Sequence, residues 1–393
     1  MATFRRSGIA GGGAGSRRYH GAAAIAVCLL LSSVLFGQYG DGERFARVGR
    51  GVQYTHERNG DVPWSIHAVK LSRSGPVGFR FASSLAENRI YGLASVAEQV
   101  EAVSARWGRA VAAVNGDFFV IRQGPYRGDP AGLQILDGEF VSSPIGTSFW
   151  IDSASRPHIG QVTSKFSVML PDGREIPFGL NQERAEDAAV LYTSRMGEST
   201  RTRAGVEFVL ERYGDGAWLP VGPDSFCAAR VSAANEHGGS YIEPSNMILS
   251  VGPKLVGNLP SLRPGTILSL SFETSPSLKG VETAIGGGPV LVSRGEAAKW
   301  DTNEYLPRHP RTAIGFNKEH FFLVVVDGRQ AGLSAGMTYP ELAALMLRLG
   351  CEEAMNMDGG GSSTLWLGGR VMNSPSDGRQ RRVANALVVV EKR

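Results

Sequence analysis

The segment NMDGGGSST, near the C-terminal end of the chain, combines an acid, three glycines and three hydroxyl residues. Asp358 precedes Gly359–Gly361, and Ser362–Thr364 follow. The flanking EEAMNM and LWLGG are apolar enough to be buried, which is not typical of a flexible linker. Consecutive glycines can turn several backbone N–H groups toward one point and bind a phosphate or an oxyanion, and Ser362 and Ser363 can add donors. The segment therefore predicts an anion site, although an isolated DGGG is also common in turns.

Further polar residues stand at the ends of other apolar runs. Asn115 and Asp117 follow AVAAV, Asp327 follows HFFLVVV, and RHPRTAIGF supplies His309 and Arg311. Each has a plain alternative, since DGR after a strand is often a hairpin turn and a histidine before proline is often a surface loop residue. Acids and cations at several strand ends, next to glycine, suit a phosphate or a sugar phosphate. Together they predict one shared site.

Two helices are expected to position these residues. SVAEQVEAVSARWG and TYPELAALMLRLG each begin with a capping box and end at glycine, with Ser95/Glu98 and Gly108 in the first and Thr338/Glu341 and Gly350 in the second. An apolar strand and then Asn or Asp beside glycine follows each helix. This repeated order has two interpretations, an internal duplication or the pattern that any α/β unit produces.

The remaining sequence favours one domain. Residues 150–285 contain many short strand-like runs with turn signals such as PDGR and RYGDG, and Gly286–Gly288 form a second triple glycine. No low-complexity linker divides residues 45–393. We therefore predict an α+β fold, a mixed β-sheet domain with flanking helices, over residues 39–393.

The first 38 residues resemble a targeting segment. Four arginines and an apolar run over residues 21–36 predict a signal peptide or an N-terminal membrane anchor, and hence a secreted or cell-envelope protein. A buried N-terminal helix is the alternative. The formal net charge of +4 equals the charge of those four arginines, so no nucleic-acid partner is expected. Cys227 and Cys351, beyond the Cys28 of this segment, could form one disulfide or remain two buried thiols.

A series of motifs resembles one known family. In order, they are AAVNGDFF, GLNQERAEDAAVLYTSRMGEST, IGGGPVLV, RHPRTAIGF, LVVVDGR, TYPELAALMLRLG, NMDGGGSSTLW and RRVANALVVV. The set, spread over roughly residues 50–391, is similar to the phosphodiester glycosidase family, which includes bacterial exopolysaccharide-biosynthesis-like proteins. The resemblance implies hydrolysis of a sugar-1-phosphodiester, with cleavage of the glycosidic C–O bond to phosphate.

The resemblance also implies a set of site residues: Asn115, His309, Arg311, Asp327, Arg329, Asn356, Asp358, Ser362, Ser363 and Arg382. Asp117 departs from the pattern, since the family has glycine or another small residue there as often as an acid. Its catalytic role is therefore in doubt.

For the mechanism, we expect Arg311 and the Gly359–Gly361 nest to bind the phosphate. Asp358 or Asp327 would activate water or stabilise an oxocarbenium-like sugar, with His309 as a third catalytic candidate. If the strands that end at the two acids are parallel and joined by the second helix, both carboxylates emerge at one sheet edge.

Two alternatives remain open. The first is a non-catalytic module that binds polysaccharide or assembles the envelope on the same residues. The second is a Ca²⁺ or Mg²⁺ site built from Asp327, Asn356 and Asp358, although no cofactor is required by the chemistry.

Overall fold

The computed structural model describes residues 45–60, 62–75, 77–300 and 307–392 of the chain. Residues Glu43–Arg393 cluster as one compact unit. The predicted signal peptide or anchor, residues 1–38, lies outside the described residues. Within the described ranges, no helix combines the length and the apolar composition that a membrane crossing requires.

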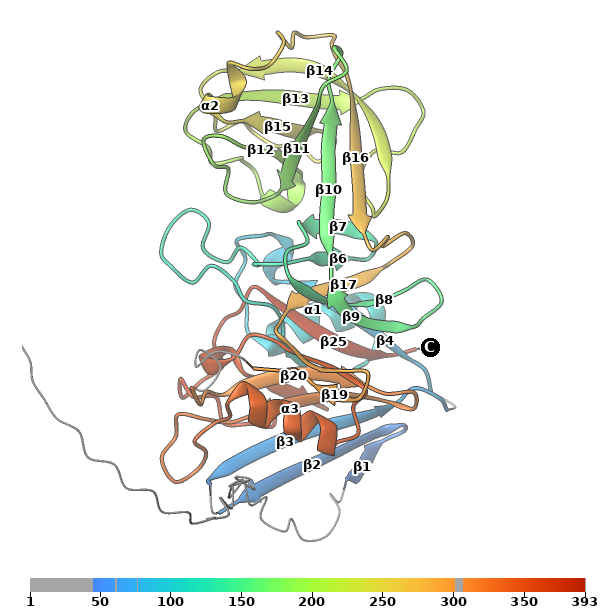
Figure 1. The fold of residues 1–393 in the computed structure, drawn as a ribbon, viewed down its shortest axis with the longest axis vertical. Helices are drawn as coiled ribbons and strands as arrows, with labels where there is room; N and C mark the ends of the chain where they lie inside the picture. Colours follow the sequence, from blue (N-terminus) through green and yellow to red (C-terminus); the bar gives the residue numbers. More distant parts are fainter. Residues whose placement is uncertain (1–44, 61, 76, 301–306, 393) are drawn as a thin grey trace, which may run out of the picture. The chain divides into compact units, whose positions relative to one another are not determined.

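An eight-stranded sheet contains the strands that end near Asp327 and Asp358 (Figure 1). Its strand order is β1-β2-β3-β21-β20-β22-β18-β19. The bounds are β1 Ala46–Gly49, β2 Val52–Asn59, β3 Trp64–Ser72, β18 Val290–Ser293, β19 Glu296–Ala297, β20 Arg311–Phe316, β21 His320–Val326 and β22 Glu353–Asn356. Helix α3, Tyr339–Arg348, begins at the predicted capping box of Thr338 and Glu341.

The connection from β21 through α3 to β22 determines where two predicted acids emerge. Both strands pair antiparallel with β20, which lies between them. They therefore run in the same direction, and Asp327 and Asp358, just beyond their ends, lie at the same edge of the sheet. This confirms the expected shared edge, although the two strands are not direct neighbours.

A second sheet repeats this local arrangement. Its order is β24-β23-β5-β25-β4, with β4 Phe79–Leu85, β5 Ala110–Asn115, β23 Leu365–Leu367, β24 Arg370–Val371 and β25 Asn385–Glu391. Helix α1, Val96–Trp107, begins at the Ser95/Glu98 capping box and ends before Gly108, as predicted. Strands β4 and β5 flank β25, and both pair antiparallel with it. The internal duplication stays a prediction, because any two α/β units can share this topology.

The two sheets pack face to face, and each carries a helix on its outer face. Along β21, Leu323 and Val325 belong to the core shared with β5 and β25, whereas Val324 and Val326 pack with residues of α3. Strand β25 alternates in the same way between the shared core and α1. Both faces of these strands are buried, which explains why their sequences are almost continuously apolar.

The strand-rich middle of the sequence forms two further structures (Figure 1). A five-stranded sheet has the order β7-β6-β17-β8-β9, with β6 Gln134–Leu136, β7 Glu139–Ser142, β8 Thr147–Ile151, β9 Pro157–Gln161 and β17 Thr283–Gly287. A closed barrel contains β10 Thr163–Met169, β11 Glu175–Leu180, β12 Ala189–Tyr192, β13 Val206–Arg212, β14 Phe226–Asn235, β15 Met247–Val251 and β16 Ile267–Ser275. The short helix α2, Pro253–Val256, follows β15.

The predicted α+β class describes this fold only loosely. Strands dominate the described residues, because the run of short strands in the middle closes into a barrel instead of alternating with helices. The two expected helices do flank the two packed sheets. Cys227 lies in β14 and Cys351 follows α3; both are buried, and no disulfide joins them. Of the two alternatives for these cysteines, the disulfide is wrong.

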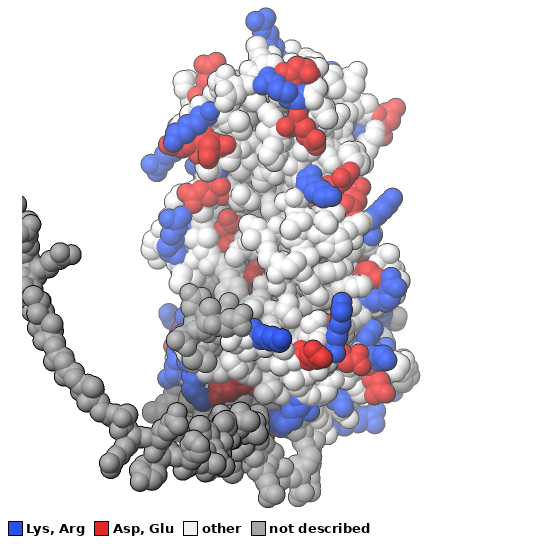
Figure 2. Space-filling model, viewed as in Figure 1, with Lys and Arg blue, Asp and Glu red and all other residues white. Residues whose placement is uncertain are grey.

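Charged side chains are distributed over the described surface. On the face drawn in Figure 2, acidic and basic residues are interspersed, and large uncharged areas separate them. This face of the described residues therefore offers no continuous basic strip.

Candidate active site

The glycine loop after Asp358 has backbone geometry that favours glycine. Gly360 has φ of 61°, a left-handed value that disfavours side chains. A Cβ at Gly359 would lie 2.7 Å from the carbonyl oxygen of Pro310, and a Cβ at Gly361 would overlap Arg381 and Asp377. Gly359 and Gly360 therefore exclude larger residues, whereas at Gly361 the ends of two flexible side chains would have to move.

Most N–H groups of this loop bind within the protein. Gly359 donates to its neighbour Asp358, Gly360 donates to the carbonyl of Pro310, and the N–H groups of Ser362 and Ser363 donate to carbonyls inside the loop. Among the described residues, the Gly361 N–H has no acceptor. The predicted nest thus offers one backbone donor to a ligand.

Asp358 is a partly exposed carboxyl group in a cationic setting. Burial raises its pKa, and this rise is opposed by a hydrogen bond from Ser362, by the Gly359 N–H at 2.8 Å, and by the charges of Arg381 and Arg329. The donors favour the carboxylate form. Asp358 can therefore accept a proton while cations lie close by.

Two guanidinium groups lie directly over the glycines. A Cβ at Gly360 would be 3.0 Å from Nη1 of Arg329, and one at Gly361 would collide with Nη2 of Arg381. Arg381 also forms an ion pair with the exposed Asp377 at 2.9 Å, and Arg329 Nη2 lies 3.1 Å from His309 Nδ1. Burial and the charges of Arg311 and Arg329 lower the pKa of His309, so the neutral ring can accept this hydrogen bond.

Asp327 has a different environment from Asp358. It is 1% exposed and accepts four hydrogen bonds, from Ser65 Oγ at 2.8 Å, His67 Nε2 at 3.1 Å, Asn373 Nδ2 at 3.1 Å and Ser374 N at 2.9 Å. Burial alone would raise its pKa, but the bonds from His67 and Ser65 outweigh that effect and lower it. The carboxylate is thus ionised and fully occupied by protein donors.

The Asp327 group is connected to the glycine loop through Asn373. The side chain of Asn373 donates both to Asp327 Oδ1 and, at 3.0 Å, to the carbonyl of Ser363. The two predicted acids therefore belong to one connected region, but only Asp358 is open to a ligand.

Three other predicted ligands bind backbone groups. Asn115 donates to the carbonyl of Asp358 at 2.7 Å. Asn356 donates to the carbonyl of Gly288 at 2.8 Å, and Arg311 donates to the carbonyls of Met337 and Pro307 at 2.8 and 2.9 Å. Their side chains hold the strand ends in place, so their geometry favours a positioning role over direct contact with a phosphate.

The structure separates Arg382 from the other predicted residues and brings its neighbour Arg381 to the site. Arg382 donates to the carbonyl of Leu93 at 2.8 Å and to Glu98 in α1. Arg381 Nη1 lies 3.4 Å from Ser362 Oγ. Two adjacent arginines in an extended segment point to different sides, and the sequence gives no signal for which one faces the site.

Asp117 lies beside the second triple glycine. Its carboxyl group accepts the N–H groups of Gly132 at 2.7 Å and Phe118 at 2.8 Å, and a Cβ at Gly286 would collide with it. Burial raises the pKa of Asp117 to about 7, and the charge of Asp358 adds to the rise. Asp117 thus lies close enough to Asp358 for the two carboxyl groups to interact electrostatically.

Ser362 and Ser363 are both buried, and only Ser362 contacts charged groups of the site. The Ser363 hydroxyl has no hydrogen-bond partner among the described residues. The described residues also contain no group of three or more His, Cys, Asp or Glu side chains arranged to hold a metal ion.

Comparisons with known proteins support the family resemblance over the C-terminal part of the chain. Residues 229–390 match the family model described as phosphodiester glycosidase. The chain is 39% identical over 83 residues to the SPbeta prophage-derived uncharacterized protein YomE of Bacillus subtilis (strain 168), covering 21% of this chain and 13% of that protein. It is 30% identical over 132 residues to N-acetylglucosamine-1-phosphodiester alpha-N-acetylglucosaminidase of Bos taurus, covering 30% of this chain and 25% of the bovine protein.

A solved structure shares the fold. The crystal structure of a hypothetical protein from Synechocystis superposes with a TM-score of 0.69 and 20% identity, covering 87% of this chain and 62% of that one. The chain spans at most a quarter of the two relatives matched by sequence. The match over residues 229–390 confirms the resemblance to the phosphodiester glycosidase family that the ordered motifs predicted.

Proposed function

We propose that the protein is an exported hydrolase that cleaves the glycosidic C–O bond between a sugar and a phosphodiester, in cell-envelope or exopolysaccharide metabolism. The observation that carries the proposal is the placement of Arg329 and Arg381 over the glycine loop beside Asp358. Two cations and a carboxyl group around a constrained backbone suit a substrate with a negative phosphate next to an anomeric carbon. The family match supports the same reaction class.

In this proposal the phosphate binds on the cationic side of the site. Arg329 and Arg381 neutralise its charge, and the Gly361 N–H donates to one of its oxygens. His309 accepts a hydrogen bond from Arg329 and so orients that guanidinium. A phosphodiester is a good leaving group, so these contacts are enough to stabilise it without strong protonation.

In this proposal Asp358 acts as the general base at the anomeric carbon of the sugar. Water attacks the anomeric carbon and gives its proton to the Asp358 carboxylate, while the electron pair of the C–O bond leaves with the phosphate oxygen. The products are a free sugar and a phosphomonoester. Asp327 acts indirectly in this scheme, because its four protein donors occupy both oxygens.

The test is a screen of the purified protein against a panel of sugar-1-phosphodiesters, with free sugar and sugar-1-phosphate measured separately. We expect free sugar and an intact phosphomonoester. Asp358→Asn should lower the release by about 100-fold or more, and Asp215→Asn, which changes an exposed acid between β13 and β14, should retain most of it. Release of sugar-1-phosphate would mean P–O cleavage and would refute the glycosidase assignment.

Two alternatives are decided by the same assay. A binding-only module would bind the substrates without turnover by the wild-type protein. A metal-assisted reaction would lose its activity in excess EDTA and regain it with Ca²⁺ or Mg²⁺. We expect full activity in EDTA, because Arg329 and Arg381 already supply positive charge at the phosphate position.

Export rests on residues 1–38, which lie outside the described residues. A fusion of residues 1–45 to a reporter that works only outside the cytoplasm should give signal. Retention of the fusion in the cytoplasm would remove the proposed secreted or envelope location and the proposed membrane attachment.

A further inference from the structure

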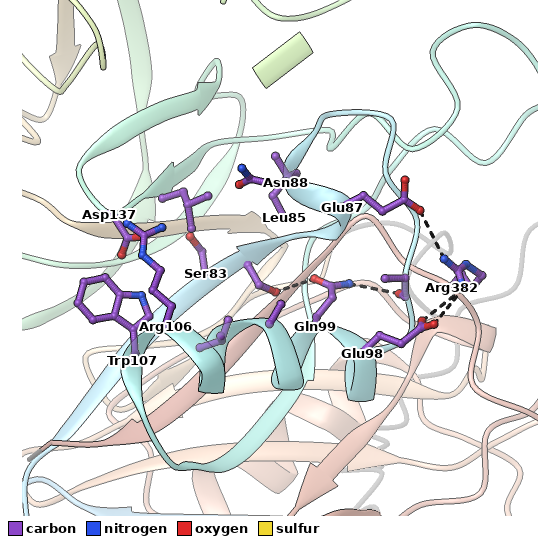
Figure 3. A pocket seen from close by; sticks show the side chains of 15 residues that line it. Ser83, Leu85, Glu87, Asn88, Glu98, Gln99, Arg106, Trp107, Asp137 and Arg382 are labelled. Carbon is purple, nitrogen blue, oxygen red and sulfur yellow. Dashed lines mark hydrogen bonds and ion pairs between the residues drawn. The ribbon is translucent and has the colours of Figure 1, made fainter. Parts of the chain in front are cut away.

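A cavity of about 490 Å³ lies away from the glycine loop, between α1, the end of β4 and the turn that joins β6 to β7 (Figure 3). Its volume is within the range of small-molecule sites, roughly 300–1,000 Å³. None of the residues assigned above to the reaction lines it. Arg382, which the family resemblance implied as a site residue, is part of its wall.

Ion pairs close the two ends of this cavity. At one end Arg106 Nη1 lies 2.7 Å from Asp137 Oδ2. At the other end Arg382 lies between Glu98 at 3.2 Å and Glu87 at 3.5 Å (Figure 3). Each arginine of the lining is thus neutralised by an acid, and the lining carries three acids against two arginines. This composition disfavours a phosphate or another anion.

The floor between the ion pairs is mainly apolar. Leu85, Val103 and Leu136 contribute buried carbon surface, and Trp107 adds an aromatic ring. The serine hydroxyls of the floor are occupied, since Ser83 and Ser84 donate to protein acceptors at 2.6 Å.

Two polar groups in the cavity wall keep unused donors. The indole N–H of Trp107 and the amide nitrogen of Asn88 have no acceptor among the described residues, although the Asn88 oxygen accepts a bond from Arg195. Glu87 and Glu98 at one end keep partly exposed oxygens that can accept further bonds, whereas both oxygens of Asp137 at the other end already pair with Arg80 and Arg106. A ligand that fits must therefore both donate and accept hydrogen bonds.

The backbone at the rim is strained. Glu87 and Asn88 are consecutive non-glycine residues with φ of 54° and 58°. Two such left-handed residues in succession are uncommon and are held by their surroundings, often at ligand sites. Asp137 also has positive φ, but it precedes Gly138 in a two-residue hairpin turn, where this conformation is ordinary.

We propose that this cavity is a second binding site, for an uncharged saccharide. Hydroxyl groups donate to the carboxylates of Glu87 and Glu98 and accept from the Trp107 and Asn88 N–H groups. The C–H faces of the sugar rings pack on the apolar floor. The site is independent of the proposed hydrolysis. Arg381 lies at the glycine loop, whereas the adjacent Arg382 lines the cavity.

The test uses the full chain and four neutral probes: maltopentaose, cellopentaose, laminaripentaose and chitopentaose. Calorimetric titration should give saturable binding of at least one probe. Ala102→Trp places a large ring in the cavity from an exposed position of α1, and we expect it to weaken binding at least tenfold. Glu101→Trp is the matched control, because Glu101 is the adjacent exposed residue of α1 and does not line the cavity.

Two further variants locate the binding. Asn88→Gly removes the side chain and suits the positive φ, so it should weaken binding without loss of folding; Ser155→Gly, at another exposed position with φ of 61°, should not. Asp358→Asn should bind the probe as the wild type does. No saturable binding, equal effects of the two tryptophan variants, or loss of binding only in Asp358→Asn would each overturn the proposal. Binding of inorganic phosphate that Ala102→Trp blocks would overturn the choice of an uncharged ligand.

Discussion

Asp327→Asn distinguishes a catalytic acid from an acid that supports the site. The substitution keeps the size of the side chain and replaces one acceptor oxygen by a donor nitrogen. Both carboxylate oxygens of Asp327 accept two bonds each, so whichever way the amide points, two protein donors lose their acceptor. The sequence motifs place Asp327 among the catalytic residues, whereas this geometry predicts that its main contribution is to stability.

The magnitude follows from the two lost bonds. A hydrogen bond to a charged group contributes about 1.5–3 kcal/mol, so two bonds are worth at least about 3 kcal/mol in a site that is 1% exposed. In large domains, a loss of 1 kcal/mol in the free energy of unfolding lowers the melting temperature by about 2 °C or more. A loss of about 3 kcal/mol should therefore lower the melting temperature of Asp327→Asn by roughly 6 °C. The pKa of Asp327 is lowered in the fold, so this stabilisation is present at neutral pH and is lost as pH falls through the folded pKa, below 3.8.

The assay compares Asp327→Asn with Asp358→Asn by thermal unfolding and by turnover. Asp358→Asn should lower turnover by about 100-fold or more with a change in melting temperature of no more than about 2 °C, because its oxygen can still accept the Gly359 N–H. Asp327→Asn should instead lower the melting temperature by roughly 6 °C and reduce turnover less than Asp358→Asn does. An unchanged melting temperature together with abolished turnover in Asp327→Asn would refute the supporting role and restore Asp327 as a catalytic acid.

Three further outcomes are expected. Gly360→Val should lower turnover at least tenfold, because valine opposes a φ of 61° and meets Arg329, while Gly216→Val, where a Cβ meets no atom within 4 Å, should not. Arg329→Gln and Arg381→Gln should each raise KM for a phosphodiester about tenfold, and equal KM values would contradict the phosphate contact. Burial raises the pKa of Asp117 to about 7 in the fold, so ionisation costs stability as pH rises from about 4 to about 7, in total about 4 kcal/mol. Asp117→Asn lacks this cost, and its melting temperature relative to the wild type should rise over that pH range; a constant difference would contradict the raised pKa.

The sequence was most informative about elements with strong local signals. The capping boxes at Ser95 and Thr338 fixed both helix starts, because the side-chain bonds that define them are formed by residues three positions apart. The apolar run before Asp327 predicted a buried strand, and its two buried faces explain the lack of alternation. The closure of the middle strands into a barrel was not predictable, since it depends on pairing between residues distant in sequence, such as Lys165 with Glu273.

The meeting of the motif residues was predictable from the sequence, and the contacts of each side chain were less so. Acid, glycine and arginine motifs do meet at one sheet edge, and Gly360 does need its positive φ. Which side chains face a ligand depends on hydrogen bonds formed only in the fold, such as that of Asn115 to the carbonyl of Asp358. Likewise, local sequence cannot tell whether Arg381 or Arg382 points to the glycine loop.

The contacts divide the polar motif residues into two groups with different consequences. Asn115, Arg311 and Asp327 are buried and use their polar atoms on backbone carbonyls or protein donors. Asp358 and Arg329 are at least partly exposed and can exchange their contacts for those of a ligand. Substitution of a residue in the first group leaves buried polar groups without partners, so its main effect is to lower the free energy of unfolding. Changing the second group affects binding or turnover directly. A motif match cannot make this distinction, because residues of both groups lie around the same glycine loop.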